Sequence, residues 1–278
     1  MTQKRVAVIH DLSCVGKCSL TVALPILSAA GIEAAVLPTA VLSTHTGGFR
    51  SPYRLNLSDS ILPIAEHWQK EGVTVDTVYT GYLCGSSQID AVLKAITLIS
   101  REETKIVTDP CFADHGKLYK GFKKPYPQKM LTLCRAADII TPNLTEAVML
   151  TDREIKEEYT KEDIESLLSA LYDLTGSQIV LTGVSSGDGR IGAAVFEGEK
   201  TTYVFADRLN RMFHGTGDIF TSALIASLLN EKSLTAAAQV AVNFTRDCIK
   251  KTMDEQTEER YGVDFESQIP NLIRYLGL

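Results

Sequence analysis

Cysteine pairs of the kind that bind zinc are missing from this sequence, and so are long apolar runs and an excess of positive charge. The six cysteines form no C-x-x-C pair, so we expect neither a zinc site nor a disulfide framework, and reduced thiols as in a cytoplasm. No apolar run is long enough to span a membrane, and the one after residue 5 is too short for a signal peptide core. With 34 acidic and 28 basic residues, the charge favours binding to neither nucleic acid nor an anionic membrane.

The remaining composition is that of a globular protein. Hydrophobic residues make up 45% of the 278 residues and charged residues 22%, which argues against a disordered, coiled-coil or collagen-like chain. A chain of this length buries about 70–75% of its unfolded surface, so one core can hold it together. No internal repeat, low-complexity linker or shift in composition divides the sequence, and we expect a single domain over residues 1–278.

Short apolar segments alternate with helical ones along most of the chain. The expected strands are 6–9, 34–42, 77–80, 105–108, 138–141 and 178–181, and the expected helices are 19–30, 58–70, 86–100, a segment around Glu146, and 163–174. A hairpin-like turn joins strands 191–196 and 201–205, and helices 218–229, 234–250 and 265–276 follow. This order predicts an α/β fold with three layers, α-β-α, around a central, mainly parallel sheet with antiparallel edge strands.

Polar segments follow the expected strands, and in open α/β sheets ligands bind beyond the carboxyl ends of the strands. These segments are 11–16, 43–50, 81–82, 109–114, 143–146 and 182–183. We expect them to form one rim that contains the functional site. The connection 44–56 is long for such a fold, and we interpret it as a lid that keeps water away from a reacting group.

A glycine-rich turn, His214-Gly215-Thr216-Gly217-Asp218, opens directly into an apolar helix. Glycines let the backbone approach a ligand, and a helix N-terminus offers unpaired N–H groups to an anion such as phosphate. Asp218 would then lie beside that anion, where a carboxylate can accept the proton of an attacking hydroxyl. The alternative is that Asp218 only caps the helix and the glycines only make the turn.

The Gly215-Thr-Gly-Asp218 segment resembles the signature of the ribokinase superfamily, and further motifs along the chain resemble those of its vitamin B6 kinases. These motifs are Ser43-Thr-His45-Thr46, Thr80-Gly81-Tyr82-Leu83, Asp109-Pro110 with Asp114-His-Gly116, and Thr141-Pro-Asn143-Leu-Thr-Glu146. They occur in the order and spacing of the family and extend over nearly the whole chain. The resemblance implies a ribokinase-like fold.

The activity implied by the resemblance is ATP-dependent phosphorylation of the 5'-hydroxymethyl group of pyridoxal, pyridoxine or pyridoxamine, a salvage route to pyridoxal phosphate. Asp218 would be the general base, and Gly215, Thr216 and Gly217 would form the anion hole. The residues implied on the ATP side are Asp109, Asp114, Thr141, Asn143, Glu146, Thr182 and Thr216. Among them, Asp109 and Glu146 would serve Mg²⁺, and the need for a monovalent cation is left open.

On the substrate side, the resemblance places four residues around the pyridine ring, next to Asp218: Asp11, His45, Thr46 and Tyr82. Tyr82 would offer a stacking surface. Asp11 departs from the family pattern, since several B6 kinases have serine there. A carboxylate at this position could pair with a pyridinium nitrogen or with an amine of the substrate.

Two other functions compete with B6 phosphorylation. The hydroxymethylpyrimidine kinases of thiamin synthesis share the fold, the base and the anion hole, although Tyr82 and the His45-Thr46 pair favour a pyridine substrate. A degenerate, non-catalytic B6-binding module is the alternative from another class, and the intact Gly215-Thr-Gly-Asp218 segment argues against it. The resemblance also implies a homodimer.

Overall fold

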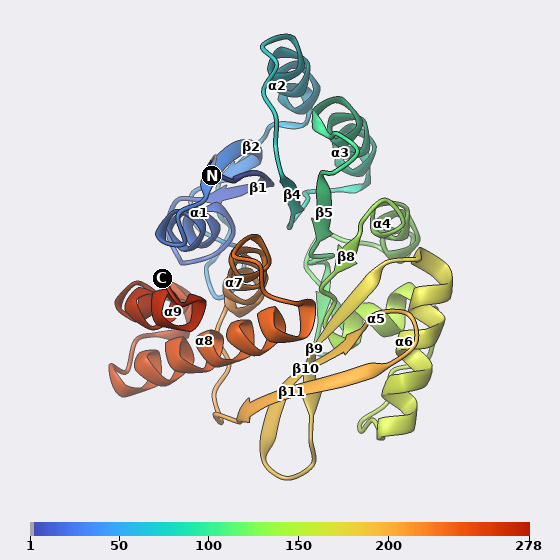
Figure 1. Ribbon diagram of the computed structural model, residues 1–278, viewed down its shortest axis with the longest axis vertical. Helices are drawn as coiled ribbons and strands as arrows, with labels where there is room; N and C mark the ends of the chain where they lie inside the picture. Colours follow the sequence, from blue (N-terminus) through green and yellow to red (C-terminus); the bar gives the residue numbers. More distant parts are fainter. Residues whose placement is uncertain (1–2) are drawn as a thin grey trace.

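The computed structural model describes residues 3–278 and shows a nine-stranded sheet between two layers of helices (Figure 1). The strand order is β11-β10-β9-β8-β5-β4-β1-β2-β3. The strands are β1 (Arg5–Ser13), β2 (Glu33–Leu42), β3 (Arg54–Asn56), β4 (Thr77–Thr80), β5 (Lys105–Thr108), β8 (Ile139–Ile140), β9 (Gln178–Ser185), β10 (Arg190–Phe196) and β11 (Thr201–Asp207). A separate small pair is formed by β6 (Ala113–Asp114) and β7 (Lys117–Leu118).

The centre of the sheet is parallel and both of its edges are antiparallel. Strands β2, β1, β4, β5, β8 and β9 pair in parallel, whereas β10 and β11 at one edge and β3 at the other run antiparallel to their neighbours. The predicted three-layer α/β fold with antiparallel edges is confirmed.

The helices cover the sheet in two groups, which Figure 1 shows on opposite sides. One group is α1 (Leu20–Ala29), α7 (Thr216–Leu229), α8 (Leu234–Asp254) and α9 (Ile269–Leu276); the other is α2 (Ser58–Lys70), α3 (Ser86–Ile99), α4 (Tyr126–Cys134), α5 (Leu144–Leu150) and α6 (Lys161–Thr175). Each group has its own apolar core. Val6 and Val8 of β1 belong to the first core and Ala7 and Ile9 to the second, because successive side chains of a strand point to opposite faces.

Several expected elements have different bounds in the structure. The strand expected at 138–141 is only two residues long, and the helix expected at 265–276 starts at Ile269, after the 3₁₀ turns η1 (Glu259–Tyr261) and η2 (Glu266–Gln268). The sequence reading also missed α4, whose first turn contains Pro127, and the short strand β3. No helix within residues 3–278 is both long and apolar enough to cross a membrane.

Candidate active site

Asp218 lies where the first turn of α7 meets the end of β1. Its Oδ1 is 3.0 Å from Nε2 of His10, and its Oδ2 accepts the backbone N–H of Ser19 at 2.8 Å. Its side chain makes no capping bond to α7, whose N-cap residue is Gly215. The carboxylate is therefore not a helix cap. It is oriented by two groups from the first strand and the loop that follows it.

The turn before α7 depends on glycine at one position and leaves space at another. Gly215 has a φ of +81°, and a Cβ there would lie 2.1 Å from the carbonyl oxygen of Lys17. Gly217 is exposed, and a Cβ there would meet only Oδ2 of Asp109, at 3.6 Å. The first N–H groups of a helix have no partner within it, so this turn offers donors to an anion beside two carboxylates.

Asp109 directly follows β5 and is the second carboxylate of this region. Burial and the nearby charge of Asp218 raise the pKa of Asp109 to about 7. Thr141 follows the neighbouring strand β8, and its hydroxyl lies 3.0 Å from that of Thr221 on α7. This contact links α7 to the residue that follows β8.

Glu146 and Asn143 form the capping box at the start of α5. Oε1 of Glu146 accepts the N–H groups of Phe112 and Ala113 at 2.8 and 3.3 Å, and its Oε2 accepts that of Asn143 at 3.0 Å. The amide of Asn143 in turn donates to the carbonyl of Ala113 at 2.8 Å. Burial, together with the charge of Asp109, raises the pKa of Glu146 to about 8. Both side chains therefore hold the loop after β5 in place.

Replacing Glu146 with alanine is expected to lower the free energy of unfolding by about 2–4 kcal/mol, because three backbone N–H groups lose a buried acceptor. Urea denaturation of the variant measures the loss. Glu103→Ala, at an exposed turn, is the control and should stay within about 0.5 kcal/mol of the parent. A Glu146→Ala variant as stable as that control would show that this cap contributes little.

The residues expected around the pyridine ring differ in their burial and in their hydrogen bonds within the protein. Asp11 is buried and accepts hydrogen bonds from the hydroxyls of Ser13 and Ser19 at 3.0 and 2.5 Å. Both ring nitrogens of His45 are used within the protein: Nε2 donates to the carbonyl of Arg260 at 2.6 Å, and Nδ1 accepts the N–H of Gly47 at 3.0 Å.

Tyr82, also expected at the ring, follows β4 and is largely buried, with its ring centroid 5.7 Å from that of Phe122. Thr46, in contrast, is exposed.

The remaining residues expected on the ATP side lie on three different elements, and Thr182, expected after a strand, lies inside β9. Asp114 is exposed on β6 and accepts the N–H of His115 at 2.7 Å. Thr182 of β9 forms an isolated bridge with Asn143. Thr216 starts α7, and its hydroxyl lies 3.4 Å from the carbonyl of Phe213.

His10 is a residue of this region that the sequence reading missed. Its side chain is fully buried, with Nε2 at Asp218 and Nδ1 at 3.3 Å from Oδ1 of Asp11. Burial alone would lower the pKa of His10, but hydrogen bonds to the two carboxylates outweigh it and raise the pKa to about 10. The available signal was a histidine beside an aspartate at the end of an apolar strand. The predicted rim begins one residue later, at Asp11.

Asp109 and Glu146, the two carboxylates implied as Mg²⁺ ligands, differ in how well they fit that role. Residues 3–278 contain no group of three or more His, Cys, Asp or Glu side chains placed to hold a metal. Mg²⁺ commonly uses one or two carboxylates together with substrate phosphates and water. Asp109 fits that arrangement, since it is buried beside another carboxylate and its charge is poorly compensated. Glu146 fits less well, because its oxygens already accept three N–H groups.

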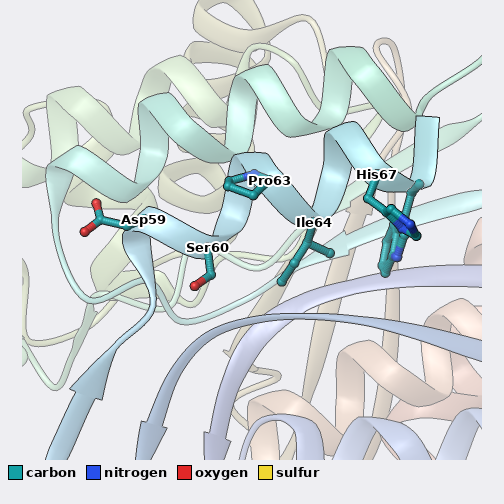
Figure 2. A pocket seen from close by; sticks show the side chains of 6 residues that line it. Asp59, Ser60, Pro63, Ile64 and His67 are labelled. Atoms are coloured by element: carbon teal, nitrogen blue, oxygen red, sulfur yellow. The ribbon is translucent and has the colours of Figure 1, made fainter. Parts of the chain in front are cut away.

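A surface hollow on α2 is a separate feature (Figure 2). It is lined by Asp59, Ser60, Pro63, Ile64, His67 and Trp68, all from that one helix. None of the predicted site residues lines it. The candidate active site is therefore the rim around Asp218 and not this hollow.

Comparisons with known proteins all find kinases. The family described as phosphomethylpyrimidine kinase matches residues 24–262. A Bacteroides thetaiotaomicron protein provisionally described as a phosphomethylpyrimidine kinase, in a crystal form with pyridoxal, is 35% identical with a TM-score of 0.92, covering 98% of this chain and 96% of that one. Pyridoxal kinase from Lactobacillus plantarum is 29% identical with a TM-score of 0.90, covering 99% and 98%.

A kinase named for pyrimidine substrates is also among the relatives. The hydroxymethylpyrimidine/phosphomethylpyrimidine kinase of Bacillus subtilis is 26% identical over 221 residues, which is 77% of this chain and 78% of that one. The family match and the shared fold both extend over most of the molecule. The chain therefore belongs to the phosphomethylpyrimidine kinase family of the ribokinase superfamily, whose members are ATP-dependent kinases.

Proposed function

We propose that this protein transfers the γ-phosphoryl group of ATP to the 5'-hydroxymethyl group of a vitamin B6 compound. The observation that carries the proposal is the position of Asp218. Its carboxylate is held by two donors at the start of α7, next to a glycine turn that leaves room for an anion. A base and an oxyanion site side by side are what transfer to a hydroxyl needs.

The proposed step is an in-line displacement. The hydroxymethyl oxygen forms a bond to the γ-phosphorus, and the bond from that phosphorus to the β,γ-bridging oxygen breaks. ADP leaves with the electron pair of that bond, and the hydroxyl proton passes to Asp218. N–H groups of Thr216 and Gly217 would stabilise the charge on the transferred group, and Mg²⁺ bound with ATP would screen the phosphate charges near Asp109.

The pyridine ring would lie between Tyr82 and the 44–56 connection. Phe49 of that connection packs against His45 and Tyr261 with ring centroids 5.1 and 5.6 Å apart, and Arg260 lies over its ring. These contacts support the lid interpretation, since they give the connection a docking surface on the C-terminal segment. Asp11 would receive a protonated nitrogen of the substrate.

Phosphorylation of hydroxymethylpyrimidine is the second candidate, and the family description and the Bacillus subtilis relative favour it. The Bacteroides thetaiotaomicron protein with pyridoxal and the Lactobacillus plantarum kinase favour the B6 substrate. The two rings differ mainly in the groups that Asp11, His45 and Tyr82 would meet, and those residues carry the choice.

A substrate panel tests the proposal. ATP- and Mg²⁺-dependent transfer is measured with pyridoxal, pyridoxine, pyridoxamine and hydroxymethylpyrimidine in parallel. We expect a B6 compound to be turned over with the highest kcat/KM of the four compounds. Turnover of the pyrimidine alone would move the protein to thiamin synthesis, and binding of pyridoxal without any transfer would indicate a binding module. Light scattering of the same sample tests the implied homodimer.

A further inference from the structure

The imidazole of His10, in the second half of β1 where the register with β2 shifts, is enclosed between two carboxylates. Nε2 lies 3.0 Å from Oδ1 of Asp218, and Nδ1 lies 3.3 Å from Oδ1 of Asp11. The ring is fully buried, and its edge meets the ring of Tyr79 with centroids 5.7 Å apart. Space for it depends on Gly81 after β4, since a Cβ there would lie 1.9 Å from Nε2.

The negative charges of Asp11 and Asp218 on either side of this ring favour its protonated, cationic form. Tyr79 and Cys18 also adjoin the cluster, but burial raises the pKa of both well above the ordinary values, so neither adds a charge. The ammonium of Lys17, from the loop after β1, is paired with Asp264 and Glu266. A protonated His10 would therefore balance one of the two buried carboxylates, and each ring N–H would have an acceptor.

One contact favours a neutral ring instead. The backbone N–H of Asp11 lies 3.2 Å from Nδ1 of His10, a geometry in which an unprotonated Nδ1 would accept it. A neutral ring would leave Oδ1 of Asp11 without the Nδ1 donor and would leave two buried carboxylates without a cation between them. The cost of such uncompensated charge outweighs one weak backbone hydrogen bond.

We propose that His10 is a positioning residue for phosphoryl transfer, an imidazolium that joins Asp11 at the pyridine side to Asp218 at the hydroxymethyl side. This inference rests on the proposed function. His10 and the N–H of Ser19 together hold both oxygens of Asp218, so the carboxylate cannot rotate away from the hydroxyl. The imidazolium also contacts Asp11. A substrate nitrogen bound to Asp11 would therefore be connected to Asp218 through His10.

The imidazolium also eases the approach of ATP. The γ-phosphate must come close to Asp218, while Oδ2 of Asp109 lies 3.6 Å from the position that a Cβ on Gly217 would take. Three carboxylates without a cation would repel that phosphate. With His10 protonated, the group of Asp11, His10 and Asp218 carries one net negative charge in place of two.

A measurement on the unaltered protein tests the charge of His10 without any substrate. The full chain is labelled with ¹⁵N-histidine, and two-bond ¹H–¹⁵N correlations are recorded between pH 6 and pH 9. We expect one of the five histidines to show two protonated ring nitrogens throughout this range. The His10→Gln spectrum assigns it. A His10 ring with a single protonated nitrogen at pH 7.5 would overturn the proposal.

Kinetics of His10→Gln test the positioning role. The amide can still donate to Asp218 but carries no charge, so we expect kcat to fall about 10- to 100-fold while the KM for the B6 compound changes less than threefold. His67→Gln, on the exposed face of α2, is the matched control and should keep the parent values. An unchanged kcat in folded His10→Gln would refute the positioning role.

The two proposals fail separately. If the substrate panel shows no transfer by the unaltered protein, the proposed function fails, and with it the role of His10 in that reaction. If transfer occurs and His10 is neutral or its replacement leaves kcat unchanged, only the present inference fails. If His10→Gln does not fold, single replacements of the other four histidines assign the His10 signals by elimination, and the spectrum of the unaltered protein still decides whether the imidazolium exists.

Discussion

Asp218→Asn is expected to lower kcat for phosphoryl transfer by about 10²- to 10⁴-fold, the usual contribution of a general base. The amide has nearly the shape of the carboxylate but cannot accept the hydroxyl proton. Nucleotide binding should persist, because N–H groups of the glycine turn and Asp109 remain and one negative charge near the phosphates is gone. Steady-state kinetics with the preferred substrate and calorimetric titration with ATP and Mg²⁺ measure the two effects.

The matched control is Asp173→Asn on the exposed face of α6, which should behave as the parent. In Asp218→Asn the amide nitrogen faces either His10 or the N–H of Ser19, so thermal unfolding has to establish that the variant is folded. A folded variant with a kcat within threefold of the parent would exclude Asp218 as the base. It would also remove the main support for the proposed reaction.

The sheet could be predicted from the sequence because its central strands are buried on both faces. Such strands appear as short apolar runs bounded by polar loop residues, as β4 and β5 do with the expected bounds. Helix α4 was missed for the opposite reason. It lies in a lysine-rich, proline-containing stretch, and its start became visible only through the burial of Tyr126 and Met130 in the second core.

The place of the site was predictable, but the partners of its side chains were not. The strand-end rule placed Asp11 and Asp109 on one rim, since parallel strands bring their carboxyl ends together. Asp218 was predicted separately, from the glycine-rich turn at the start of a helix, and the structure brings its charge close to Asp109. The strand-end rule could not show that the oxygens of Glu146 accept the N–H groups of three residues, because those hydrogen bonds depend on the path of the loop after β5. His10 was missed because the predicted rim begins at Asp11, one residue after it.

Gly215→Ala is expected to lower the free energy of unfolding by about 2–5 kcal/mol, from the left-handed φ and from overpacking. The φ of +81° is unfavourable for alanine, and its Cβ would lie 2.1 Å from the carbonyl oxygen of Lys17, which is backbone and cannot move aside cheaply. The β1 loop and the start of α7 would have to separate. Activity should be lost together with stability, as urea denaturation and kinetics of the same preparation would show.

Gly217→Ala is the matched variant that separates the two roles of the turn. Its Cβ would meet only Oδ2 of Asp109, at 3.6 Å, so stability should stay within about 1 kcal/mol of the parent, a helical glycine-to-alanine change being mildly favourable. The new methyl group would nevertheless occupy space beside the carboxylate where the γ-phosphate is expected. We therefore expect kcat/KM for ATP to fall more than tenfold in a fully folded protein. Full activity in Gly217→Ala would mean that the phosphate does not bind at this turn, because the added methyl group would obstruct it there.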